Sequence, residues 1–213
     1  MKKLLLFIIL IFISEITTVS MNFNFKRSRI EDYCKYPQTL RDYAVERASR
    51  LYSLNEITVF IIDTSIEEGV NPIDVLAYLK IENPKLDPKA INKNYVVEKK
   101  YNKKTKKWIK TKKLVSEDIG IGQLNTKHID LFIQQFWIAY GETEEFDIYN
   151  YKHNIKISIR LFKSHLKTFD NDTICAVMAY NAGVGKVLKY DIPQKTLYTY
   201  VPLFMKYKAI MEK

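Results

Sequence analysis

The stretch N-P-I-D-V-L-A-Y-L-K-I-E-N-P, residues 71–84, decides how the rest of this chain is interpreted. Asn71 is a good N-cap, and Pro72 suits the first helical position because its missing N–H would have no helical partner there. Pro84 disfavours the α conformation of the residue before it, so the helix must end beside Glu82. The stretch therefore predicts a helix that carries a carboxylate in its last turn.

Glu82 shares one face of this predicted helix with apolar and aromatic side chains. Counting back in helical steps reaches Leu79, Tyr78 and Val75. A carboxylate on an apolar face loses hydration when it ionises, so we expect its pKa to be raised. A raised pKa is what a general acid needs near neutral pH, although a half-exposed Glu at a fraying helix end has the same spacing.

The N-terminus has the pattern of a secretory signal peptide. Two lysines precede ten apolar residues, 4–13, and a polar stretch then ends in Thr18-Val19-Ser20. This pattern predicts a signal peptide over residues 1–20 and a linker or N-terminal arm over residues 21–38. The apolar run is short for a membrane span, but an uncleaved anchor stays open because the cleavage site is not Ala-x-Ala. We expect an exported protein of the periplasm or cell envelope.

The composition restricts the partners and cofactors. Thirty-four Lys and Arg residues against 24 Asp and Glu give a net charge of +10, which suits an anionic polymer or surface. Cys175 lies in an apolar helical pattern and is interpreted as a core residue, with a disulfide to Cys34 as the alternative. The histidines have no ligand spacing with the cysteines, so we predict no metal site and no cofactor.

Residues 95–115 alternate in character and carry nine lysines together with Tyr101, Trp108 and Thr111. The alternation predicts a β hairpin whose turn lies at residues 102–105. Lysines interleaved with aromatic rings can bind a nucleic acid or a glycan, since rings stack on bases and on sugars. A solvated, flexible excursion is the alternative interpretation.

Most of the remaining chain has helical periodicity. We expect helices over residues 39–51, 57–66, 126–140, 154–169, 173–182 and 196–211. The second of these helices follows a capping-box pattern, Ser53-Leu54-Asn55-Glu56. Gly69, shortly after its apolar run, is a natural C′ residue at which the helix would stop. Gly120 and Gly122, followed by Gln123, indicate a backbone that another group approaches closely.

Several short motifs follow one another in a characteristic order. They are A-Y-L-K-I-E ending at Glu82, G-I-G-Q-L at 120–124, N-I at 154–155, A-Y-N-A-G at 179–183 and Y-V at 200–201. In this order they resemble the SLT-type lytic transglycosylases, lysozyme-like enzymes that cut the glycan strands of peptidoglycan. The resemblance covers roughly residues 70–202, and A-Y-N-A-G is its most specific part. It implies a mainly α, lysozyme-like (α+β) domain over residues 39–213, with a small β hairpin beside the active-site groove.

The resemblance also implies roles for individual residues. Glu82 falls on the family's single catalytic carboxylate, which protonates the glycosidic oxygen and then takes the proton from the C6 hydroxyl of N-acetylmuramic acid. The sugar's own 2-acetamido group stabilises the oxocarbenium-like centre, and a 1,6-anhydro product forms without water. The substrate-binding positions that it implies are Asn83, Gln123, Tyr180, Asn181 and Tyr200.

The chain departs from the family pattern in two residues, in one spacing and in its lysine-rich hairpin, which is longer than is typical of the family. Asn83 stands where the family usually has Ser, and Gly122 stands where it has a Met that covers a bound sugar. Thr196 lies four residues before Tyr200, where three are usual. These departures leave the carboxylate untouched and put the subsite preference in doubt.

Three other functions stay open. A hydrolytic muramidase of the same fold would use Asp118 or Glu117 as a second carboxylate, although both acids also fit a solvated loop. A catalytically inactive peptidoglycan-binding envelope protein would use the old groove and the basic hairpin. A nucleic-acid-binding protein would explain only the charge, and the leader argues against it. We expect a monomeric enzyme whose partner is peptidoglycan and not nucleic acid, with transient membrane or envelope-complex association left open.

Overall fold

The computed structural model describes residues 37–213. The predicted signal peptide, residues 1–20, lies outside the described residues, as do residues 21–36 of the predicted linker. Helix α2 (Pro37–Ala48) begins two residues inside that linker. The chain divides into two units after Tyr43, and the second unit, Ala44–Lys213, is compact and contains the site. No helix among the described residues is long and apolar enough to cross a membrane.

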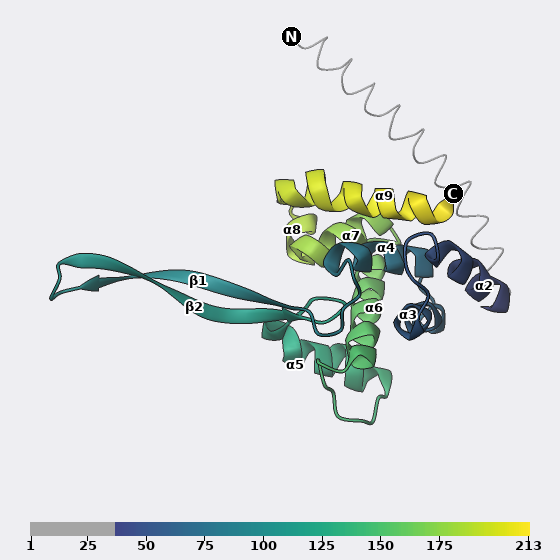
Figure 1. Cartoon of the computed structure of the whole chain (residues 1–213), viewed down its shortest axis with the longest axis horizontal. Helices are drawn as coiled ribbons and strands as arrows, with labels where there is room; N and C mark the ends of the chain where they lie inside the picture. Colours follow the sequence, from purple (N-terminus) through teal and green to yellow (C-terminus); the bar gives the residue numbers. More distant parts are fainter. Residues whose placement is uncertain (1–36) are drawn as a thin grey trace, which may run out of the picture. The chain divides into compact units, whose positions relative to one another are not determined.

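Helix α4 (Pro72–Glu82) is buried around its whole circumference. Five consecutive residues, 75–79, have no exposed surface, so the helix is part of the core and not merely packed on it by one face. Helices α3 (Glu56–Glu67) and α9 (Val201–Glu212) pack against it (Figure 1). The other elements of the second unit are arranged around this central helix.

The ends of α4 and α3 show which side chains begin and end these helices. The Asn71 side chain accepts a hydrogen bond from an amide of the first turn at 2.9 Å, and α4 ends at Glu82, so the predicted helix is confirmed. The predicted capping box of α3 is wrong in its cap residue. Asn55 and not Ser53 caps α3, accepting from the Thr58 amide at 2.9 Å, because Asn is as strong an N-cap as Ser and lies next to the first helical residue.

The sheet has three antiparallel strands in the order β1 (Ile91–Asn102), β2 (Lys107–Ile119) and β3 (Leu124–Asn125). Strands β1 and β2 form the predicted hairpin, which projects away from the helices of the second unit (Figure 1). The hairpin begins earlier than predicted, because residues 91–94 pair with residues 116–119 at its base. A register shift after Asn94 separates this base from the projecting part.

Residues 126–140 are helical as predicted, but the winding changes along them. A 3₁₀ turn η1 (Thr126–His128) leads into α5 (Ile129–Phe132), a π-helical turn η2 (Ile133–Trp137) and a 3₁₀ turn η3 (Ile138–Tyr140). The buried residues of the core cluster that these turns join are Ile119, Leu124, Phe132, Phe136, Trp137, Ile148 and Ile157. Neighbouring aromatic residues at the end of the π turn are both buried, which a regular amphipathic helix would not predict.

The C-terminal part of the chain consists of helices, which carry Tyr180, Asn181 and Tyr200 of the site. They are α6 (Tyr151–Thr168), α7 (Thr173–Ala182), α8 (Val184–Leu188), the π-helical turn η4 (Thr196–Tyr200) and α9. Helix α6 begins three residues before the predicted start, because Asn150 caps it by accepting from the Lys152 amide at 3.0 Å. Cys175 in α7 is a free, half-buried thiol, whereas its predicted interior position would have buried it fully.

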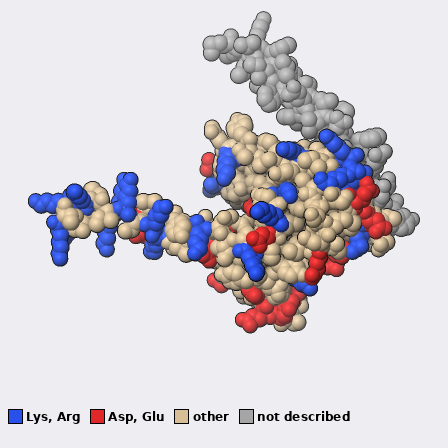
Figure 2. Space-filling model, in the orientation of Figure 1, with Lys and Arg blue, Asp and Glu red and all other residues tan. Residues whose placement is uncertain are grey.

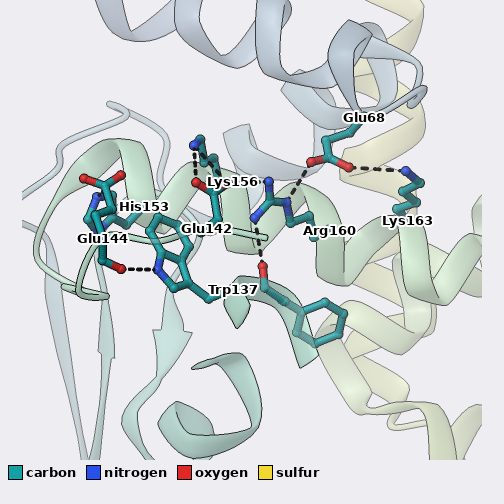
Figure 3. A network of polar contacts seen from close by, with 9 residues as sticks. Glu68, Trp137, Glu142, Glu144, His153, Lys156, Arg160 and Lys163 are labelled. Atoms are coloured by element: carbon teal, nitrogen blue, oxygen red, sulfur yellow. Dashed lines mark hydrogen bonds and ion pairs between the residues drawn. The ribbon is translucent and has the colours of Figure 1, made fainter. Parts of the chain in front are cut away.

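A buried arginine ties α6 to its neighbours. Arg160 donates to Glu68, after the end of α3, at 2.7 Å, to Glu142 at 2.6 Å and to the carbonyl of Phe136 at 2.9 Å (Figure 3). Two lysines of α6 complete the ion pairs of the same carboxylates. A buried cation is tolerated only when its donors are satisfied, so this network fixes α6 firmly in place.

Candidate functional site

Glu82 lies at the point where the buried helix α4 ends. Its side chain is half-buried, and this burial is the main cause that raises the pKa of its carboxyl to about 7. A hydrogen bond from Tyr200 and the charge of Lys195 lower the pKa, while the charge of Asp118 raises it. The predicted rise in pKa is confirmed. Both protonation states of Glu82 are therefore accessible near neutral pH.

Tyr200 is placed directly against this carboxyl. Its hydroxyl donates a hydrogen bond to Oε1 of Glu82, and only 5% of the residue is exposed. Burial, followed by the charge of Glu82, raises the pKa of Tyr200 well above its ordinary value. The hydroxyl therefore stays a neutral donor, which can orient the carboxylate and stabilise its ionised form.

Asn181 fixes the segment that carries Tyr200. Its Oδ1 accepts a hydrogen bond from the Thr196 hydroxyl at 2.7 Å, which joins the end of α7 to the first residue of η4. The extra residue between Thr196 and Tyr200 lies in this π-helical turn, whose wider winding accommodates it. Tyr200 consequently reaches Glu82 despite the altered spacing.

Tyr180, in α7, lies between the loop after β2 and the core. Its hydroxyl donates to the Gly122 carbonyl at 2.8 Å, and its ring centroid is 4.7 Å from that of Tyr78. Burial raises the pKa of Tyr180, and the nearby charge of Glu82 raises it further. The Tyr78 hydroxyl, one turn before Glu82, is buried and has no hydrogen-bond partner among residues 37–213. Three tyrosines thus surround one carboxyl.

Helix α6 is the element that closely approaches the backbone at Gly120 and Gly122. A Cβ on Gly122 would lie 1.7 Å from Oγ of Ser158, and one on Gly120 would lie 2.6 Å from Nδ2 of Asn154. Asn154 is fully buried, accepts from the Gly122 amide at 2.9 Å and donates to the Ile119 carbonyl at 2.9 Å. The predicted close approach is confirmed. A side chain at position 122 would meet α6 in this arrangement, so the missing Met does not simply uncover a sugar.

Asn83 connects the end of α4 to the same loop. It is 5% exposed, and its Nδ2 donates to the Asp87 carbonyl at 2.7 Å and to the Gly120 carbonyl at 3.3 Å. Its Oδ1 accepts from the Asp87 amide at 3.0 Å. The amide group is thus held by backbone on both sides. These contacts describe a positioning residue, and the implied contact with substrate stays a prediction.

Gln123 has a left-handed backbone, with φ of 49°. This conformation is unfavourable for a residue other than Gly, and two side-chain hydrogen bonds accompany it. Nε2 of Gln123 donates to the Gly120 carbonyl at 2.7 Å, and Oε1 accepts from the Asn92 side chain. The side chain is thereby fixed between the loop and strand β1, and its implied contact with a glycan also stays a prediction.

Asp118 is the second carboxylate of this region. It lies half-buried in β2, where Asn94 donates to Oδ2 at 2.9 Å and Asn125 donates to Oδ1 at 2.7 Å. The interpretation of Asp118 as part of a solvated loop is therefore wrong. Its charge acts on Glu82, whereas Glu117 forms an ion pair with a lysine of β1 at 3.7 Å.

Sequence reasoning missed the residues that hold this site together. They are Asn94, Asn125, Ser158 and Asn154 in its role of fixing the loop. The N-I motif at 154–155 was a usable signal, because a buried Asn inside an amphipathic helix needs partners. Asn94 gave no signal, since its approach to Asp118 depends on the register at the base of the hairpin.

The comparison with protein families covers most of this arrangement. The family model for the transglycosylase SLT domain matches residues 71–199, from the N-cap of α4 to the residue before Tyr200. No curated protein shows a significant match to the chain. The match spans more than half of the 213 residues and includes both Glu82 and the A-Y-N-A-G segment. The chain therefore belongs to the transglycosylase SLT domain family, a lysozyme-like family of enzymes that act on peptidoglycan.

Proposed function

We propose that this protein is a lytic transglycosylase that cleaves the bond between N-acetylmuramic acid and N-acetylglucosamine and leaves a 1,6-anhydro end. The observation that carries the proposal is the Glu82 carboxyl, whose pKa of about 7 results mainly from burial and which accepts a hydrogen bond from Tyr200. The substrate lies outside the cytoplasm. The predicted signal peptide over residues 1–20 agrees with export to the periplasm or envelope, where residues 39–213 would act.

In this proposal Glu82 acts twice. As a neutral acid it gives its proton to the glycosidic oxygen while the bond from C1 to that oxygen breaks. As a carboxylate it then takes the proton of the C6 hydroxyl, whose oxygen forms the new bond to C1. No water enters, and Glu82 ends in its starting protonation state. A pKa near neutral suits both steps, because neither protonation state is strongly disfavoured.

The other site residues support this chemistry in different ways. Tyr200 holds the carboxyl and stabilises its ionised form, which the second step needs. Asn181, through Thr196, keeps Tyr200 in reach. We further propose that Gln123, Tyr180 and Asn83 lie along the bound glycan, where their fixed orientations would limit the movement of the sugar.

The test is mass spectrometry of purified peptidoglycan after incubation with the wild-type protein and with Glu82→Gln. We expect anhydro-muropeptides from the wild type and a loss of roughly 10³-fold in Glu82→Gln, the scale of general acid–base catalysis. Glu117→Gln is the matched control and should behave as the wild type. Reducing-end N-acetylmuramic acid would refute the transglycosylase. Intact glycan with the protein still bound to it would instead indicate a non-catalytic envelope protein.

One observation favours hydrolysis as a second candidate function. Hydrolytic glycosidases usually carry two carboxylates beside the scissile bond, and Asp118 is held by two amide donors where its charge acts on Glu82. With Asp118 assisting, water could replace the C6 hydroxyl as the attacking group. The product mass separates the two reactions, because hydrolysis adds one water to each cut.

A further inference from the structure

The projecting part of the hairpin has two faces of different chemistry. Alternate residues of a strand point to opposite faces, and cross-strand partners share a face. The register pairs Tyr95 with Leu114, Lys99 with Lys110 and Tyr101 with Trp108. The face so formed is here called the aromatic face, and its members are Tyr95, Val97, Lys99, Tyr101, Trp108, Lys110, Lys112 and Leu114. It combines three aromatic rings and three lysines with two exposed aliphatic side chains.

The rings of the aromatic face are exposed although they are large. Trp108 is 67% exposed and Tyr95 is 51% exposed, and the Trp108 ring meets Tyr101 edge-on with centroids 5.4 Å apart. Nothing in the described core covers this part of the hairpin, which extends away from the helices (Figure 1). Exposed rings gathered on one face of a strand pair are typical of a binding surface.

Charge is distributed unequally between the two faces. Residues 95–114 contain a single carboxylate, Glu98, which lies on the opposite face and pairs with Lys113 at 3.7 Å. Lys99 and Lys110 line a hollow of about 310 Å³ together with Trp108, all on the aromatic face. Figure 2 shows lysines along the whole projecting part of the hairpin, residues 95–114, which is here called the arm. The aromatic face therefore offers cations and ring surfaces without a competing acid.

We propose that the aromatic face is a second binding site for peptidoglycan, separate from the site at Glu82. The rings would stack on the sugars, and the lysines would pair with the carboxylates of the strand and of its peptides. The identity of this polymer rests on the proposed function. The face presents rings and cations close together, and an anionic glycan likewise combines uncharged sugar surfaces with acidic groups.

Two features favour a glycan over the other anionic partners. Residues 91–119 contain no arginine, the side chain best suited to paired phosphate contacts, which argues against a nucleic acid. The lysines at 99, 110 and 112 interrupt the apolar surface, so the face lacks the continuous apolar stripe that a membrane surface needs.

Strand β2 gives the arm a direct connection to the catalytic region. It runs from Lys107 to Ile119 and contains Asp118 at its base. Thirteen extended residues span roughly 40 Å at about 3.3 Å per residue. A glycan held along the arm would remain close to Glu82 after each cut, which raises its effective concentration at that site.

Co-sedimentation with purified peptidoglycan tests the site, using the full chain with Glu82→Gln so that the polymer is not digested. One triple variant changes three lysines of the aromatic face to Gln: Lys99, Lys110 and Lys112. The control triple variant removes the same charge from the opposite face by changing Lys100, Lys107 and Lys113 to Gln. We expect about a tenfold loss of affinity for the first variant and less than about twofold for the second. Equal losses, or no loss in either, would overturn the proposal.

A second pair of variants tests the rings. Trp108→Ala should also weaken binding about tenfold, because a sugar could no longer stack on the ring, whereas Ile109→Ala on the opposite face should not weaken it. Circular dichroism melting checks that each variant is folded. Tighter binding to single-stranded DNA, or to vesicles of anionic phospholipid, with the same dependence on Trp108 would overturn the glycan assignment.

The two proposals fail separately. If the wild type yields anhydro products but no variant of the aromatic face loses affinity for peptidoglycan, only the second binding site is wrong. If the wild type yields no anhydro products while the aromatic-face variants still lose affinity, the reaction is wrong and the binding site stands.

Discussion

The Glu82 site and the projecting hairpin differ in what surrounds their polar groups. At the site, the Tyr200 hydroxyl donates to the Glu82 carboxyl, and the side chains of Tyr180 and Asn154 donate to backbone carbonyls. Burial raises the pKa of Glu82 to about 7. On the hairpin, Trp108 is 67% exposed and the lysines lie in solvent. Burial thus creates the reactive group, while exposure leaves rings and cations free to meet a large polymer. Substitutions should affect stability strongly in the first region and weakly in the second.

Among the residues of the site, the largest expected effect on stability concerns Glu82 itself. Its folded pKa of about 7 lies above the ordinary 4.5, so its favourable contribution is complete below pH 4.5 and is lost as the pH rises to 7. Glu82→Gln should therefore be more stable than the wild type by about 3 kcal/mol above pH 7 and equally stable below pH 4.5. Chemical denaturation at several pH values checks this. A pH dependence identical to that of the wild type would contradict the burial of a reactive carboxyl.

The next effect concerns the residue that holds the loop under the site. Asn154→Ala removes a buried amide that bonds to the Gly122 amide and to the carbonyls of Ile119 and Ile148, so the free energy of unfolding should fall by about 2–3 kcal/mol. Asn102→Ala is the comparison on the hairpin. It removes two hydrogen bonds of an exposed turn and should cost less than about 1 kcal/mol in urea denaturation. Equal losses would erase the difference between the regions.

Asp118→Asn probes the second carboxylate. If Asp118 assists the attack of water, the rate of glycan cleavage should fall by roughly a hundredfold, the lower end of general acid–base catalysis. The charge of Asp118 raises the pKa of Glu82, so its removal should move the decline of activity with pH to lower pH. A pH–rate profile from the release of muropeptides measures both. An unchanged rate and profile would leave Asp118 a purely structural residue.

Tyr200→Phe should shift the same profile in the opposite direction. The hydrogen bond from Tyr200 lowers the pKa of Glu82, so without it the acid stays protonated to higher pH and the decline of activity moves upward. We expect roughly a tenfold loss of rate at the optimum, the scale of one hydrogen bond to a charged group. A shift in the same direction as that of Asp118→Asn would show that the two residues do not act on Glu82 as described.

The smallest expected effect is on the stability of the arm. Trp108→Ala should change the free energy of unfolding by less than about 1 kcal/mol, because this ring packs on a neighbouring tyrosine and not in the core. Thermal melting beside Trp137→Ala, whose ring is 1% exposed and whose loss should cost about 3–5 kcal/mol, gives the contrast. A comparable cost for both substitutions would show that the arm is part of the core.

Local rules predicted the elements that depend on neighbouring residues. Asn71, Pro72 and Pro84 sufficed to bound α4, and the alternation of residues 95–115 sufficed for the hairpin. The rest depends on contacts between distant segments. Asn94 reaches Asp118 only because of the register at the base of the hairpin. No sequence pattern gives that register, and so the sequence leaves open whether Asp118 is a second carboxylate or a residue of a solvated loop.

Gly122 and Ser158 occupy one shared volume, and this restricts how the sequence can change. A Cβ on residue 122 would lie 1.7 Å from Oγ and 2.7 Å from Cβ of Ser158, so even alanine at 158 would leave a clash. A larger residue at 122 therefore requires glycine at 158 or a displaced α6, and glycine inside a helix costs roughly 1 kcal/mol. A side chain at 122 is therefore unfavourable as long as Ser158 is in place. The two positions should accordingly be epistatic, so that a larger residue at 122 is accepted only where 158 has also changed.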